Sequence, residues 1–172
     1  MNQPRGTPPA KGRPKPRGPG DGGSYPEHVE AVWPGYLEGG YFDDEGFLRI
    51  EYVARERLEP LVRAMVKPRP HADQPLTSAQ LRRFFHHCRR AEARLKAETA
   101  SWSEVHPQIV FLDAAAQDAV GKVQPKIPAL FADFISRNVA ATRSEMEFLK
   151  GFLPHFEALV GFASPFFQRD RN

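Results

Sequence analysis

The stretch LTSAQLRRFFHHCRRAEARLK, residues 76–96, decides the fold class, because its apolar residues recur at the spacing of one helix face. These residues are Leu81, Phe84, Phe85, Cys88, Ala91 and Leu95. Thr77 and Gln80 fit a capping box, in which the threonine hydroxyl accepts a backbone N–H and the glutamine side chain reaches back to the helix start. We therefore predict an amphipathic helix from Leu76 to Lys96 whose apolar stripe is buried.

The opposite side of this helix is almost purely cationic. It carries Arg82, Arg83, His86, His87, Arg89, Arg90, Arg94 and Lys96. Like charges three or four residues apart destabilise a helix by about 0.2–0.5 kcal/mol per pair, and Glu92 and Glu98 are expected to offset little of this repulsion. Arg82 and Arg83 also oppose the helix dipole in the first turn. A solvated face of a core helix is one interpretation, but a cationic face built against its local electrostatics favours a phosphate-bearing partner.

Positive charge is concentrated in one region of the chain. The 172 residues have a net charge of +3, and this length fits one domain with a substantial core. The first 20 residues hold five of the 24 lysines and arginines and no acid, whereas nine cations and two acids lie between Arg63 and Lys96. The body is therefore near neutral with one basic region, unlike a uniformly basic histone-like protein.

Residues suited to catalysis or metal binding are not arranged for either task. Cys88 is the single cysteine, so no intrachain disulfide is possible, and its place on the apolar stripe predicts an inert, buried thiol. Three short motifs lack the spacing of zinc ligands: His86-His87-Cys88, Glu104-x-His106 and His155-x-Glu157. The acids at 43–45 could bind a cation or a neighbouring basic face, but are expected to cap a helix. We predict no catalytic residue, metal or cofactor, no small-molecule substrate and no membrane segment, hence a cytoplasmic protein.

The predicted architecture is all-α, a single bundle of five to six helices, with no alternating strand pattern and no internal repeat. The expected divisions are a disordered, basic, Pro/Gly-rich tail (1–23), an irregular strap (24–39), a helical bundle domain (40–165) and a C-terminal tail (166–172). The strap carries Tyr25, Trp33 and Tyr36, whose rings are expected to dock on the bundle.

Prolines set the expected limits of the helices before and after the central one. A helix from about Ile50 is expected to kink at Pro60, or else to end near Glu56 with a second helix beginning at Pro60. Residues 103–108 are expected to interrupt the chain, with Pro107 as the first residue of the next helix. The apolar side of that helix is expected to comprise Ile109, Leu112, Ala116, Ala119 and Val123.

Two further helices complete the predicted bundle. Gly121 and Pro125 are expected to end the preceding helix, and Pro128 to open the next, which ends near Asn138 or Ala140. The last helix is expected over 142–163 with a bend at Pro154. Its apolar residues include Phe156, which we place in the core together with Phe84.

Three stretches resemble the small subunit of type III-A CRISPR effector (Csm) complexes, in an order and spacing that span about residues 40–163. They are GYFDDEGFLR (40–49), LTSAQLRRFF (76–85) and FLPHFEALV (152–160). The resemblance implies an all-helical, non-catalytic protein whose copies stack along the backbone subunits and line the channel that holds guide RNA paired to target RNA. Carried over by position, Arg82 and Arg83 match the basic helix start of the family, and Lys122 stands in for its basic residue in the third helix.

The expected partners are therefore the backbones of guide RNA and target RNA, other effector subunits and further copies of the chain. The candidate RNA-binding residues are Arg63, Arg82, Arg83, Arg89, Arg90, Arg94, Lys96, Lys122 and Lys126. A rival hypothesis is a helical DNA-binding transcriptional regulator that uses the helix from Leu76 to Lys96. Base readers usually present Asn and Gln among their cations, whereas this face suits phosphates. A helical hydrolase, the third hypothesis, lacks convergent acids.

Overall fold

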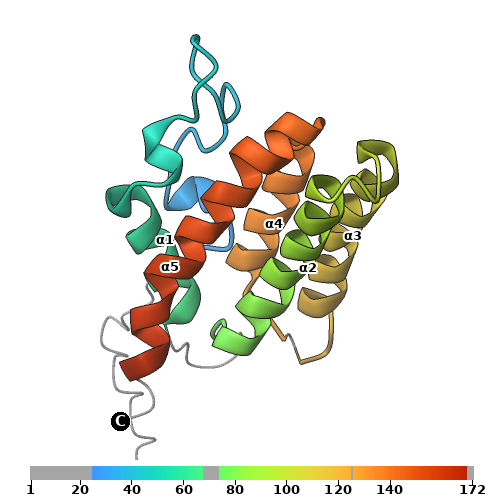
Figure 1. Ribbon diagram of the computed structural model, residues 1–172. Helices are drawn as coiled ribbons and strands as arrows, with labels where there is room; N and C mark the ends of the chain where they lie inside the picture. The colour runs from blue at the N-terminus through green and yellow to red at the C-terminus, as the bar shows by residue number, and fades with distance from the viewer. Residues whose placement is uncertain (1–24, 68–73, 125, 170–172) are drawn as a thin grey trace, which may run out of the picture.

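The computed structural model describes residues 25–67, 74–124 and 126–169, and within them the fold is a single bundle of five α-helices without a strand (Figure 1), which confirms the predicted class. In chain order the elements are η1 (Val29–Ala31), η2 (Ile50–Tyr52), α1 (Arg55–Val66), α2 (Ser78–Lys96), α3 (Trp102–Val120), α4 (Ala129–Ala141), η3 (Glu147–Phe152) and α5 (Leu153–Arg169). The tail predicted to be disordered, 1–23, lies outside the described residues.

Helix α5 runs through the middle of the bundle, with α1 packed on one side and α2 on the other (Figure 1). Aromatic rings join these layers. The Phe156 ring of α5 stacks on Phe152 at 5.6 Å and meets Phe134 of α4 and Phe85 of α2 edge-on, at 5.6 and 5.4 Å. Phe84 of α2 contacts Phe131 of α4 at 5.3 Å. The predicted burial of Phe84 and Phe156 is confirmed.

Helix α2 begins as predicted. Its N-cap Thr77 accepts the backbone N–H of Gln80, and the Gln80 side chain accepts the N–H of Thr77 at 2.9 Å, which closes a capping box. Cys88 is completely buried on the apolar side, and burial raises the pKa of its thiol to about 12. A thiol held in the protonated form is a poor nucleophile, as expected for a structural residue.

The expected interruption at 103–108 is wrong. Helix α3 starts at Trp102, and Pro107 lies inside it. A second capping box explains the earlier start, because the Glu104 carboxylate accepts the Ser101 backbone N–H at 2.8 Å. Val105 and Ile109, both fully buried, then pack on either side of the proline. Gly121 ends this helix as predicted, whereas Pro125 lies outside the described residues.

Helix α1 also passes through its proline. Pro60 removes one backbone hydrogen bond at a cost of about 3 kcal/mol, but Leu58 and Leu61 beside it are fully buried, at about 1.5–3 kcal/mol each. The expected helix end near Glu56 is therefore wrong. The expected start of this helix at Ile50 is also wrong, because Ile50 lies in η2 and is 75% exposed. Val123 was misplaced as an inward helical residue, since its exposed fraction is 103%.

The last helix begins with a wider turn. Helix α4 opens after its N-cap Pro128 as predicted, and η3 then forms a π-helical segment directly before α5, which extends to Arg169 rather than ending at Ala163. It thus includes the first residues of the expected C-terminal tail. Gly151 in η3 lies against Tyr41, where an added Cβ would come within 2.6 Å of the ring. Only glycine lets these backbones approach so closely.

A buried chain of hydrogen bonds ties residues 25–52 to the bundle. Tyr41 donates to the Asn138 side-chain oxygen at 2.8 Å, and the Asn138 amide donates to the Tyr36 hydroxyl at 2.6 Å. Tyr36 donates in turn to Nε2 of His155 at 2.6 Å, and Nδ1–H of His155 donates to the Tyr52 carbonyl. Every donor thus has an acceptor, and the ring of His155 is neutral. Trp33 and Tyr36 are buried, which confirms the expected docking of these two rings.

Candidate nucleic-acid interface

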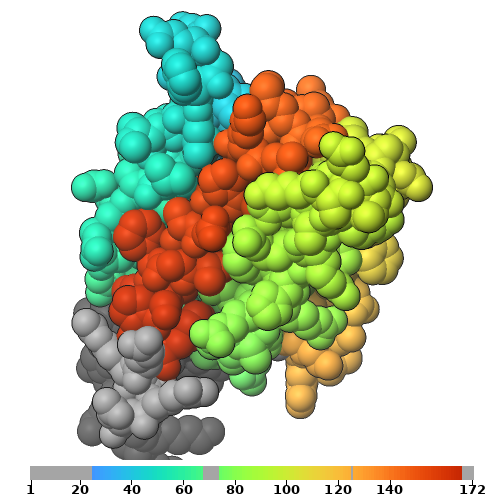
Figure 2. Space-filling view, in the orientation of Figure 1, coloured from blue at the N-terminus to red at the C-terminus, as the bar shows by residue number. Residues whose placement is uncertain are grey.

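The outward face of α2 is a continuous exposed surface, seen at the front of the molecule in Figure 2. Its exposed cations are Arg82, Arg83, Arg89, Arg90 and Lys96, and Arg94 is half-buried. Because the apolar stripe of the helix packs against α5 and α4, these side chains can only point outward or along α3. One helix therefore presents six of the nine candidate residues.

The connection between α3 and α4 adds two lysines at the start of α2. The Gln80 side chain donates to the backbone carbonyl of Lys126, and Lys122 and Lys126 line a shallow hollow together with Gln80. Helices α2 and α3 run antiparallel, so the end of α3 lies beside the start of α2, and the exposed Arg82 and Arg83 follow in the second turn of α2. We call Arg82, Arg83, Lys122 and Lys126 the basic end of α2.

Glu92 has a larger role than the sequence predicted. Its carboxylate, only 9% exposed, pairs with Arg89 and with Lys96, both at 2.6 Å. The expectation that Glu92 offsets little of the repulsion is therefore wrong for the second half of the helix. Lys122 pairs with Asp118 at 2.9 Å. Among the described residues, no carboxylate pairs with Arg82, Arg83, Arg90 or Arg94, so unpaired guanidiniums are found in both halves of α2.

His87 on α2 has structural surroundings, whereas His86 is exposed. Nε2 of His87 lies 3.0 Å from the Gln108 carbonyl of α3, so this ring nitrogen is a donor rather than a metal ligand. The His87 Nδ1 is 3.4 Å from the Arg90 guanidinium. The described ranges contain no group of three or more His, Cys, Asp or Glu that could hold a metal ion.

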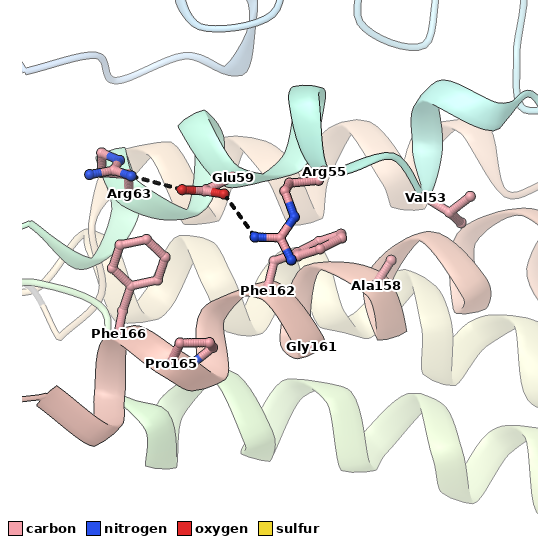
Figure 3. Close-up of a pocket in the computed structure, with 9 residues that line it drawn as sticks. All are labelled: Val53, Arg55, Glu59, Arg63, Ala158, Gly161, Phe162, Pro165 and Phe166. Atoms are coloured by element: carbon pink, nitrogen blue, oxygen red, sulfur yellow. Dashed lines mark hydrogen bonds and ion pairs between the residues drawn. The ribbon is translucent and has the colours of Figure 1, made fainter.

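Arg63 is separate from the other candidates. It lies on α1, facing α5, where its guanidinium pairs with Glu59 at 2.8 Å and covers the Phe166 ring at 5.4 Å (Figure 3). Sequence reasoning grouped it with α2 because both fall in the basic region. The structure instead brings Lys122 and Lys126 to α2, through a Gln80 contact that no sequence spacing revealed.

The elements that form this surface coincide with a family match. The Csm2 Type III-A family profile matches residues 61–166, which is more than half of the chain and includes all of α2, α3 and α4. The chain belongs to the Csm2 family. Csm2 is a structural subunit of the type III-A CRISPR effector complex, so this chain assembles with other Csm subunits.

The family match favours one of the hypotheses that the sequence left open. It gives no support to a DNA-binding transcriptional regulator. Neither the curated proteins nor the solved structures gave a match to this Csm2 chain. None of the helices in the described ranges combines the length and apolar character that a bilayer span requires. The part of the chain before residue 61, with the strap and η2, lies outside the matched region.

Proposed function

We propose that this Csm2 chain is a non-catalytic RNA-binding subunit of the cytoplasmic type III-A complex. Its copies stack along the channel of guide RNA and target RNA, and the basic face of α2 holds the RNA backbone. The observation that carries this proposal is the row of uncompensated guanidiniums on Arg82, Arg83 and Arg90.

The chemistry of the face favours phosphates over bases. Arg82 and Arg83 are exposed without a carboxylate partner in the described residues, so their N–H groups are free to bind phosphate oxygens in bidentate fashion. The nearby amide of Gln80, which could read a base edge, is already bound to Lys126. The proposal thus predicts binding that is independent of RNA sequence and sensitive to salt.

The test is RNA affinity across a salt series for the wild-type chain and for Arg82→Ala/Arg83→Ala/Arg90→Ala. For a single strand, log K falls with log salt at about −0.7 per phosphate neutralised, so losing three contacts should flatten the slope by about two units. The helix should stay folded, since alanine is the best helix former and repulsion between the arginines is relieved.

A matched control removes the same charge elsewhere. The control variant is Arg57→Ala/Arg143→Ala/Lys150→Ala, and all three cations are exposed. Arg57 lies on α1, Arg143 lies between α4 and η3, and Lys150 lies in η3. This control should keep the wild-type slope, because its three cations lie outside the α2 face. Both triple variants lower the net charge by the same amount, so a difference between them reports the α2 face itself. Equal flattening in the two variants would assign binding to net charge alone, and an undiminished slope in the α2 variant would remove this face from the RNA site.

A further inference from the structure

A groove between α1 and α5 lies on a part of the molecule that the proposed RNA face does not use. It encloses about 420 Å³ and has an apolar floor and wall that include Phe162, Pro165 and Phe166 of α5 (Figure 3). Arg55 covers the Phe162 ring at 5.3 Å, as Arg63 covers Phe166 at 5.4 Å. Two cation–aromatic pairs of the same kind thus stand along the groove, with their rings one turn apart on α5 and their arginines about two turns apart on α1.

The rim of this groove has a positive balance. Glu59 lies between the two arginines and pairs with both, at 3.4 Å to Arg55 and 2.8 Å to Arg63. One carboxylate faces two guanidiniums, which are 70% and 63% exposed. An occupant should therefore combine apolar side chains with negative charge.

The turn of residues 41–50 has those properties. It projects from one end of the molecule (Figure 1), whereas the groove runs along α1 and α5 from Val53 and Arg55 to Arg63 and Phe166 (Figure 3). Phe47 and Ile50 are 66% and 75% exposed, so they leave apolar surface without a partner in the described residues. Asp44 and Glu45 are exposed beside Phe47 and add negative charge.

This turn is held in one shape. The Asp43 carboxylate accepts the backbone N–H groups of Glu45 and Phe47 at 3.0 and 2.8 Å. Asp43 therefore caps this turn, and the expectation that it caps a helix is wrong. The Arg49 side chain donates to the Phe42 carbonyl at 3.0 Å, and Gly46 supplies the left-handed backbone at φ 83°. A preorganised projection loses little conformational entropy on binding.

We propose that the 41–50 turn of one copy docks in the α1–α5 groove of a second copy. Phe47 and Ile50 would meet the phenylalanine-lined wall, and Asp44 and Glu45 would face the Arg55 and Arg63 rim. The two surfaces are different, so each copy can bind one neighbour through its turn and another through its groove, and the contact forms an open stack. This inference rests on the proposed stacking along RNA and assigns a contact to it.

The first test fills the groove without disturbing the fold. Gly161 lines the groove, and a Cβ built on it meets no atom within 4 Å. Gly161→Leu should therefore block the groove while favouring helix α5, and Gly161→Ala is the matched control that leaves most of the space open. Self-association is measured without RNA by sedimentation, and we expect Gly161→Leu to weaken it by about tenfold or more.

A mixing experiment then tests the head-to-tail arrangement. Phe47→Asp disables the turn and leaves the groove intact, whereas Gly161→Leu does the reverse. Each variant alone should be monomeric, and their mixture should form a dimer and nothing larger, because only one working contact remains.

A wild-type chain that stays monomeric up to about 1 mM would overturn the inference, as would a Phe47→Asp variant that associates normally. A monomeric mixture of the two variants would do the same. RNA affinity is measured on both variants in parallel. If these variants change the salt slope of RNA binding but leave self-association unchanged, the groove belongs to the RNA site instead. If self-association behaves as expected but the α2 face does not bind RNA, only the proposed RNA site is overturned.

Discussion

Replacing Phe156 by alanine should lower the free energy of unfolding by about 3–5 kcal/mol. The ring is completely buried and lies within 5.6 Å of three aromatic neighbours, Phe85, Phe134 and Phe152. These residues come from three helices, so the cavity would open where α2, α4 and α5 meet and could not close by movement of one side chain. For a domain of this size the melting temperature should fall by roughly 10 °C, measured by circular dichroism.

Phe111→Ala is the control for this change. Phe111 lies on α3 and is 65% exposed, so the same substitution should alter the free energy of unfolding by less than about 0.5 kcal/mol. Similar losses in the two variants would show that the ring cluster around Phe156 is not the centre of the core.

Acid should destabilise the fold through His155. Burial lowers the pKa of this histidine from 6.5 to about 4 in the folded chain. Between these pKa values the unfolded chain binds a proton that the folded chain does not, so stability is complete above pH 6.5 and is lost as the pH falls toward 4. The loss is about 1.4 kcal/mol per pH unit, or about 3 kcal/mol in all. It arises because a charged ring would be buried between Tyr36 and the Tyr52 carbonyl.

Urea unfolding between pH 7 and pH 4 measures this effect. His155→Gln is the comparison, because glutamine can accept and donate hydrogen bonds but does not titrate. Acid will also act on carboxylates such as Glu104, whose pKa is lowered by hydrogen bonds from Ser101, and this contribution is common to both chains. The slope of stability with pH should be steeper for the wild type by the amount given above. Parallel curves would show that His155 is not the titrating group.

The sequence predicted elements whose signals are local. The capping box of α2 and its 3.6-residue apolar period lie within one stretch, and both were confirmed. Pro60 and Pro107 misled the prediction, because the burial of Leu58, Leu61, Val105 and Ile109 depends on distant helices and outweighs one lost hydrogen bond. Local proline rules carry no information about such packing.

The roles of polar residues likewise depend on contacts with residues that are distant in the sequence. His155 was considered only as a possible metal ligand, although its spacing from Phe152, Phe156 and Leu159 places it on the apolar side of the last helix. That spacing could have revealed its burial, but not its bonds to Tyr36 and Tyr52, which lie about 100 residues earlier in the chain. In the candidate interface, the contact of Gln80 with Lys126 was hidden for the same reason.

Photo-crosslinking in the purified effector complex tests the central claim most directly. A photoreactive phenylalanine analogue is placed at His86, which is exposed on the α2 face between Arg82 and Arg90, and in a second chain at Phe47, in the turn assigned to a neighbouring copy. We predict that His86 yields adducts with RNA, whereas Phe47 yields adducts with protein. Adducts at His86 that contain only protein would contradict an RNA-binding role for the α2 face.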